Sequence, residues 1–259
     1  MRLPLFHVDA FAIRPLEGNP AAIVPLDHWL DDETLLNIAR ENNLSETAFF
    51  VPNETGFHLR WFSPTTEIPL CGHATLASAY VIFNELGYNK DLIHFETLSG
   101  ELIVLKKDDD IIMDFPTKAP KPCTIPDGLE EALGVKIKET YQNHFVLCVT
   151  HREADVKNAK PDHKALSRIK PGEFILTAKS QTYDFVSRCF APAHGLEEDP
   201  VTGAAHCVSA PYWADKLGKA TLRARQVSKR GGDVTCVLKG NRVELMGRCA
   251  LFMKGTITL

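Results

Sequence analysis

The apolar positions of this chain follow two different periods, and the period changes from one element to the next. Short apolar runs at 5–10, 21–24 and 46–51 predict strands. Residues 32–43 instead repeat their apolar positions at helical spacing, and Asp31 stands where an N-cap belongs, so we expect an exposed amphipathic helix there. Residues 74–83 are apolar on every face, which is typical of a helix enclosed by protein.

The chain also contains one pattern twice. The segment FHLRWFSP at 57–64 matches FVSRCFAP at 185–192 in phenylalanine, arginine, phenylalanine and proline at the same places. After a short insertion the matches resume, with Gly72 opposite Gly203 and Leu86-Gly87 opposite Leu217-Gly218. Because these matches are collinear, we expect two structurally equivalent halves.

Each copy can be interpreted physically. A strand ends at a proline, a polar loop follows, and a glycine opens an apolar helix. Gly87 and Gly218 are expected to end the two helices in the left-handed conformation, and Pro211 is expected to kink or shorten the second one. Strands are predicted after the first helix at 93–97, 102–106 and 111–115. Each half is therefore predicted to be an α+β unit, a mostly antiparallel sheet curled around one helix, and the halves join in the proline-rich stretch 116–126.

Composition narrows the class of protein. A net charge of −4 with 24% charged residues gives no reason to expect nucleic acid or an anionic membrane as a partner. No run reaches the roughly 18–20 apolar residues of a membrane span, and the start of the chain does not resemble a signal peptide. The seven scattered cysteines, with no CxxC pair, favour reduced thiols, a cytoplasmic location and no metal site.

The two helix starts are the first candidate site. If they face one another across a cleft, the free N–H groups at 72–74 and 203–205 would bind an anion, most simply a substrate carboxylate. The alternative is that both glycines only permit a tight turn before a buried helix.

Four side chains could carry the chemistry. Glu46, at the start of a strand, is either a semi-buried base or an outward-facing residue. His73 follows the helix glycine, where the helix dipole is expected to lower its pKa and favour the neutral form. Asp199 is a candidate acid or an ordinary turn residue. Cys71 lies at the helix N-terminus, where a thiolate would be stabilised. No nucleotide-binding, metalloprotease or serine-hydrolase motif is present, which favours proton transfer without a cofactor.

At these residues the chain resembles the phenazine-biosynthesis-like (PhzF-like) isomerases, which share the diaminopimelate epimerase fold. The resemblance runs nearly from end to end and is carried by five blocks: VDAF with GNPAA at 8–22, LSETAF at 44–49, RWFSP through PLCGHAT at 60–75, EDPVTG at 198–203 and SKRGG at 228–232.

The resemblance implies two pseudo-symmetric domains, each a β-barrel-like sheet around a central helix, with the active site in the cleft between them. The expected bounds are 1–116, with 250–259 returning to this domain, and 117–249. Glu46 would be the general acid and base, with its pKa raised by partial burial, and His73 and Asp199 would assist it. The expected substrate-binding residues are Asn19, Gly72, Ala74, Gly203, Ala204, Ser228 and Arg230. The partner would be a small carboxylated substrate, with no cofactor and no metal, and the assembly a homodimer.

Two positions depart from the family pattern. Diaminopimelate epimerases use two facing cysteines, but Thr202 stands opposite Cys71 in the repeat, so two-thiol racemisation is not expected. Ala204 replaces a serine that many relatives carry, so the substrate is not expected to be the phenazine precursor. A racemase or epimerase assisted by Cys71, and a catalytically silent binding protein, stay open as alternatives.

Overall fold

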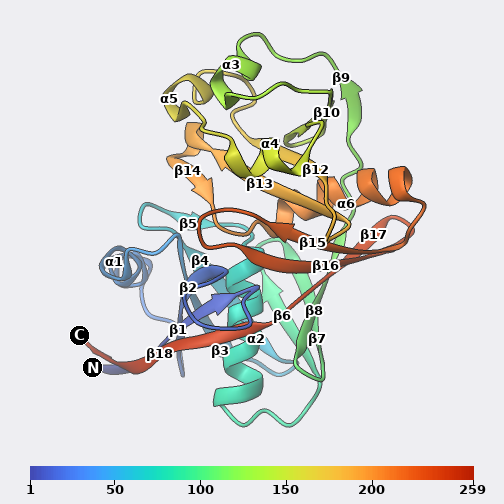
Figure 1. Cartoon of the computed structure of the whole chain (residues 1–259). Coiled ribbons are helices and arrows are strands. Elements are labelled where there is room, and N and C mark those ends of the chain that lie inside the picture. Colours follow the sequence, from blue (N-terminus) through green and yellow to red (C-terminus); the bar gives the residue numbers. More distant parts are fainter. The chain divides into compact units, whose positions relative to one another are not determined.

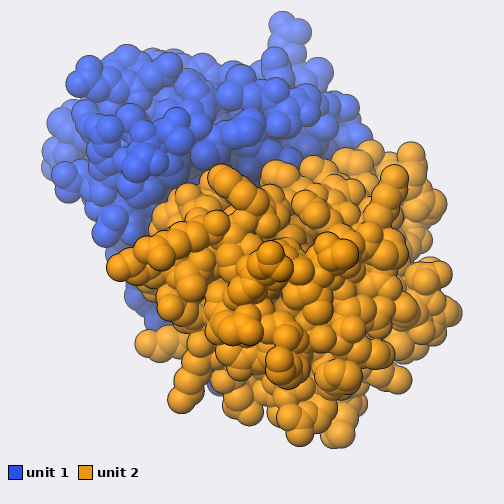
Figure 2. All heavy atoms as spheres, turned by 90° about the horizontal axis from the view of Figure 1, so that it is seen from above, with its two compact units in different colours: residues 1–114, 246–259 blue, residues 115–245 orange.

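The computed structural model describes residues 1–259, and their contacts divide the chain into two compact units. Unit 1 comprises residues 1–114 and 246–259, and unit 2 comprises residues 115–245; Figure 2 colours them separately. The end of the chain thus belongs to the same unit as its beginning.

Unit 1 is built on a sheet with one long helix inside it. Its elements are β1 (Arg2–Ala10), β2 (Asn19–Pro25), α1 (Asp32–Asn42), β3 (Glu46–Pro52), β4 (Phe57–Phe62), β5 (Glu67–Ile68), α2 (Gly72–Glu85), β6 (Leu92–Thr97), β7 (Gly100–Lys107), β8 (Asp110–Pro116) and β18 (Cys249–Thr258). The strands pair in the order β18, β1, β2, β3, β4, β6, β7, β8, and β5 pairs with β4. Only β2–β3 and β4–β6 are parallel, and helices α1 and α2 lie in the two crossovers that these pairs require.

Helix α2 is the core of unit 1. Every residue from His73 to Ala79 is buried, as are Val81, Ile82 and Phe83. It contacts β1, β2, β3, β7 and β18, and Figure 1 shows it enclosed by strands. Since each fully buried Leu, Ile, Val or Phe contributes about 1.5–3 kcal/mol, this helix is held by burial on all sides and its first turn is fixed in place.

Unit 2 has the same design. Its elements are β9 (Lys121–Cys123), α3 (Leu129–Leu133), β10 (Glu139–Gln142), β11 (Val146–Val149), α4 (Glu153–Asn158), α5 (His163–Leu166), β12 (Phe174–Lys179), β13 (Phe185–Ala191), the 3₁₀ turn η1 (Pro192–His194), β14 (Leu196–Asp199), α6 (Gly203–Leu217), β15 (Thr221–Gln226), β16 (Gly232–Lys239) and β17 (Arg242–Gly247). The parallel pairs are β11–β12 and β13–β15, again with helices in their crossovers.

The repeat therefore extends further in the structure than in the sequence. The pairs β2–β3 and β4–β6 of unit 1 correspond to β11–β12 and β13–β15 of unit 2, and α2 corresponds to α6. The sequence match begins only at β4 and β13, because the earlier strands keep their pairing while their side chains have diverged.

The predicted helix boundaries need one correction. Gly87 and Gly218 have φ of +69° and +64°, the left-handed conformation expected after each helix. Pro211, however, does not shorten α6, which continues for 15 residues through the proline to Leu217. No helix is long and apolar enough to cross a bilayer. All seven cysteines are free thiols, five of them buried.

Candidate active site

The start of β2 places Asn19 beside the start of helix α2. Gly18 before it has φ of +66°, and a Cβ there would lie 2.1 Å from the Ala10 carbonyl oxygen, so only glycine fits this turn. The turn pairs Asn19 with Ala10 and buries its amide completely. Asn19 Nδ2 lies 3.2 Å from His73 Nδ1.

Glu46 is the first residue of β3. Its parallel neighbour on β2 is Ala21, two residues after Asn19, so the sheet register brings the two polar side chains to one end of the strands. The Glu46 side chain keeps 18% of its surface exposed, whereas the next residues of the strand are buried. The pattern of the sequence left open whether Glu46 faces outward, and the structure shows a semi-buried carboxylate.

Cys71 and His73 come from the start of α2. Cys71 is the N-cap residue, but no side chain caps this helix and no acidic residue lies in its first turn. The first N–H groups of α2 therefore lack the hydrogen bond that a capping oxygen would supply, although the Ala74 N–H lies close enough to the Cys71 sulfur to act on the pKa of that thiol. A carboxylate-binding role for this helix start stays a prediction.

Glu46, Cys71 and His73 form a compact triad. His73 Nε2 lies 3.1 Å from Glu46 Oε2, and Cys71 Sγ lies 3.5 Å from His73 Nδ1. Both Nε2 and Oε2 are buried and neither makes a hydrogen bond of good geometry, so the two atoms are in contact without being aligned. The triad is thus a close ion pair with one thiol beside it.

The pKa values of Glu46 and His73 are each shifted in the direction opposite to the one predicted. Burial raises the pKa of Glu46, but the charge and hydrogen bonding of His73 outweigh it, so the net shift is downward and the carboxylate is charged at neutral pH. Burial lowers the pKa of His73, but Cys71 and Glu46 raise it well above its ordinary value. The predictions of a raised Glu46 pKa and a neutral His73 are therefore wrong, because each residue neighbours the other.

The prediction of a stabilised thiolate is also wrong. Burial and the Glu46 carboxylate raise the pKa of Cys71, and these effects exceed the stabilisation by His73 and the Ala74 N–H. The position at the helix N-terminus therefore does not by itself lower the pKa of Cys71 below that of an ordinary thiol.

The predicted residues of unit 2 gather around the start of α6. The Thr202 hydroxyl donates to Asp199 Oδ2 at 2.5 Å. An aspartate is too weak a base to ionise an alcohol, so this bond fixes Thr202 and does not turn it into a substitute for a second thiol. Gly203 is buried in the first turn of α6, whereas Ala204 is exposed and adds no polar atom.

Two residues of unit 2 hold this turn in shape. The Ser228 hydroxyl donates to the Pro200 carbonyl at 2.8 Å and accepts from the Gly231 N–H at 3.1 Å. The fully buried Gln226 accepts from the Thr202 N–H at 2.9 Å and donates to the Asp199 carbonyl at 2.6 Å. Sequence reasoning missed Gln226, although a glutamine in phase with the inward-facing Leu222 and Ala224 was a usable signal.

A second feature that the sequence analysis missed is an arginine–glutamate pair that occurs in both units. Arg60 on β4 binds Glu67 on β5 through two hydrogen bonds of 2.7 Å, and Arg188 on β13 binds Glu198 on β14 through bonds of 2.6 and 2.8 Å. We call each of these an arginine clasp. The clasp holds the short strand that leads into α2 or α6, so it sets the position of the helix start.

Thus Asn19, Glu46, Cys71 and His73 meet in unit 1, and Asp199, Thr202 and Ser228 meet in unit 2. Arg230 is partly buried in the loop after Ser228. That the two groups share one cleft stays a prediction.

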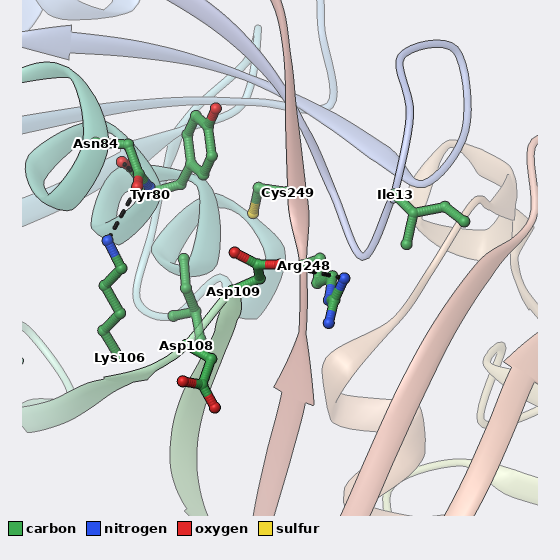
Figure 3. Close-up of a pocket in the computed structure, with 9 residues that line it drawn as sticks. Ile13, Tyr80, Asn84, Lys106, Asp108, Asp109, Arg248 and Cys249 are labelled. Atoms are coloured by element: carbon green, nitrogen blue, oxygen red, sulfur yellow. Dashed lines mark hydrogen bonds and ion pairs between the residues drawn. The ribbon is translucent and has the colours of Figure 1, made fainter.

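Unit 1 also contains a cavity of about 340 Å³ that none of the predicted site residues lines (Figure 3). Its polar groups largely satisfy one another, since Lys106 Nζ donates to Asn84 Oδ1 at 3.0 Å and Arg248 Nη1 lies 3.5 Å from Asp109 Oδ2. We assign no chemistry to it.

Comparisons with known proteins show which family the chain belongs to. A family model described as phenazine biosynthesis-like protein matches residues 8–255. An uncharacterized isomerase of Pseudomonas aeruginosa is 49% identical over 259 residues, covering 100% of both chains. A PhzF family protein from Enterococcus faecalis, known from its crystal structure, is 45% identical with a TM-score of 0.98 and covers 100% of both chains. These relatives support an isomerase-type enzyme, and the chain belongs to the phenazine biosynthesis-like (PhzF) family.

More distant structures identify the fold. A hydroxyproline epimerase from Agrobacterium vitis has a TM-score of 0.63 at 9% identity, covering 100% of this chain and 93% of that chain. The fold is therefore that of the diaminopimelate epimerase-like proteins, as the family resemblance implied.

Proposed function

We propose that the chain is a cofactor-independent isomerase of a small carboxylated metabolite, with Glu46 as its single general acid and base. The observation that carries the proposal is the contact of 3.1 Å between the semi-buried Glu46 carboxylate and His73 at the start of a buried helix. A carboxylate kept charged in this way is already in the form that accepts a proton.

The lowered pKa of Glu46 limits the substrates that it can deprotonate. A weaker base removes protons only from carbon acids made acidic by their surroundings, such as a carbon between a carboxylate and a double bond. In the proposed step, the C–H bond breaks, Glu46 takes the proton, and the electron pair moves into the unsaturated system. The Glu46 carboxyl exchanges its proton with solvent and then delivers a proton to another carbon, so the product is an isomer and Glu46 is regenerated.

The neighbouring groups have supporting roles in this proposal. Protonated His73, fixed beside Glu46 and Asn19, would stabilise the negative charge of the resting carboxylate and donate to the substrate. The N–H groups of Gly72 and Ala74, at the start of α2, would hold the substrate carboxylate. Asp199, Gly203, Ala204, Ser228 and Arg230 are proposed to contact substrate, and Asp199→Asn is the variant that probes this part.

Solvent-proton exchange tests the proposal. The protein should incorporate deuterium from D₂O into a carboxylated metabolite, and Glu46→Gln should not. The alternative of a Cys71-assisted racemase or epimerase is favoured by the contact between its sulfur and His73, and it requires Cys71→Ser to lose exchange as well.

A further inference from the structure

Unit 2 contains a cavity of about 480 Å³ that is lined mainly by basic and polar side chains. Its volume lies within the roughly 300–1,000 Å³ that is usual for small-molecule sites. The cavity forms where two segments meet beside β13. Helix α4 packs against that strand, and the loop after β15 is tied to it because the Val227 N–H donates to the Ser187 carbonyl at 2.7 Å. Both segments contribute side chains to the cavity.

Four basic side chains line this cavity, and only two of them have a carboxylate partner. Lys157 pairs with a glutamate of its own helix, and Arg188 binds Glu198 in the arginine clasp. Lys160 and Lys229 are exposed, and their ammonium groups form no ion pair or hydrogen bond within the chain. The whole chain has a net charge of −4, so two uncompensated positive charges at one cavity are a local reversal of sign.

Arg188 also removes a source of repulsion for an anion at this place. The carboxyl end of a helix carries partial negative charge, and α4 ends at the cavity. Arg188 Nη1 donates to the Ala159 carbonyl at 2.8 Å and to the Val156 carbonyl at 3.4 Å, so the last carbonyl groups of α4 are occupied. The arginine side chain is only 12% exposed, which keeps these bonds shielded from water.

We propose that this cavity binds the phosphate group of a small molecule. Its free donors are the ammonium groups of Lys160 and Lys229 and the side-chain amide of Asn158, which makes no hydrogen bond within the chain. A phosphate monoester carries about −1.5 to −2 charges at pH 7, which two ammonium groups balance. Lysine binds phosphate as a point charge, whereas the planar fork of a free guanidinium, which suits a carboxylate, is missing here because Arg188 is engaged.

The bound phosphate would join two segments of unit 2. Lys160 follows α4, and Lys229 lies in the loop between β15 and β16. Ser228 of the same loop holds the turn before α6 through the Pro200 carbonyl, so its hydroxyl is already engaged. A ligand that links this loop to the end of α4 should raise the thermal unfolding midpoint of the protein, because it binds only the folded state.

Calorimetric titration of the full chain at constant ionic strength tests the proposal. The probes are inorganic phosphate, glycerol 3-phosphate and succinate, a dicarboxylate of similar charge. We expect one phosphate site per chain, with succinate bound at least about fivefold more weakly. Tighter binding of glycerol 3-phosphate than of inorganic phosphate would assign the site to an ester, and the reverse order to free phosphate. Succinate bound as tightly as both, or no binding of either phosphate probe, would overturn the proposal.

Charge-removing variants locate the site. Lys160→Gln and Lys229→Gln should each weaken phosphate binding about fivefold, and the double variant should weaken it further. The matched control is Lys121→Gln, which removes an exposed lysine of β9 that does not line the cavity and should leave the affinity unchanged. Unchanged affinity in the double variant, or an equal loss in Lys121→Gln, would overturn the site. None of these lysines belongs to the proposed proton-transfer site, so the result does not depend on the proposed function.

Discussion

His73 Nε2 and Glu46 Oε2 lie 3.1 Å apart, although the two residues belong to different elements, the first turn of α2 and the first residue of β3. For Glu46 this contact reverses the pKa shift that burial alone would give, and for His73 it does so together with Cys71. It makes the resting site an imidazolium–carboxylate pair, and the chemistry and stability of unit 1 both depend on it.

The pair predicts a particular pH dependence of stability. The folded pKa of Glu46 is lowered below 4.5, so its contribution is complete above that pH and is lost as the pH falls through the folded value. The folded pKa of His73 is raised above 6.5, so its contribution is complete below that pH and is lost as the pH rises through the folded value. The free energy of unfolding that His73→Asn removes should therefore be largest between about pH 4.5 and 6.5.

Urea unfolding of the wild type and His73→Asn at pH values within this range and on both sides of it measures the difference. The matched control is His94→Asn, which breaks a pair with Glu101 of similar length, 2.7 Å, but far more exposed. That control should change stability little at any pH, because exposed ion pairs contribute about 0–1 kcal/mol. A difference for His73→Asn that does not vary with pH would mean that the two groups do not share a charge interaction.

Cys71 should be unreactive in the resting protein. Burial and the adjacent carboxylate raise its pKa, so little thiolate is present at neutral pH and alkylation by iodoacetamide should be slower than that of the partly exposed Cys123. Mass spectrometry of the labelled peptides gives both rates in one experiment. Faster labelling of Cys71 than of Cys123 would show an activated thiol and favour the Cys71-assisted alternative.

The arginine and the glutamate of each arginine clasp should be energetically coupled. Replacing one partner of the Arg60–Glu67 pair removes two charge-assisted hydrogen bonds, and Arg60 then keeps only its contact of 2.8 Å with Asp32. Arg60→Met and Glu67→Gln should therefore each destabilise the protein, and the double variant by less than their sum. We expect a coupling energy of about 1–2 kcal/mol from a double-mutant cycle in urea. The Arg188–Glu198 pair should give a similar value, and strictly additive effects in either unit would show that the clasp does not hold its helix start.

The sequence was most informative where local chemistry decides the structure. The N-cap at Asp31, which accepts the Thr34 N–H at 2.9 Å, and the glycine at 87 follow from conformational preferences of single residues. The all-apolar helix and the internal repeat predicted the enclosed helices α2 and α6, because burial on every face leaves a pattern in sequence.

The sequence could not predict distances and contacts between residues that lie on different helices and strands. The pKa shifts of Glu46 and His73 depend on their separation, which only the packing of α2 against β3 sets. The clasps likewise depend on pairing between β4 and β5, since matched arginines and glutamates at repeated positions do not by themselves show contact. Pro211 does not shorten α6, because the tertiary burial of this helix outweighs the local cost of a proline inside it.

Deuterium incorporation is the most direct test of the proposal that Glu46 transfers the proton. A pool of small carboxylated metabolites is incubated in D₂O with wild type, Glu46→Gln and Glu41→Gln, the last removing an exposed carboxylate on α1. The account predicts exchange into at least one metabolite with wild type and Glu41→Gln, and a loss of at least about 100-fold in Glu46→Gln with the fold unchanged. Exchange by Glu46→Gln at the rate of the wild type would contradict it.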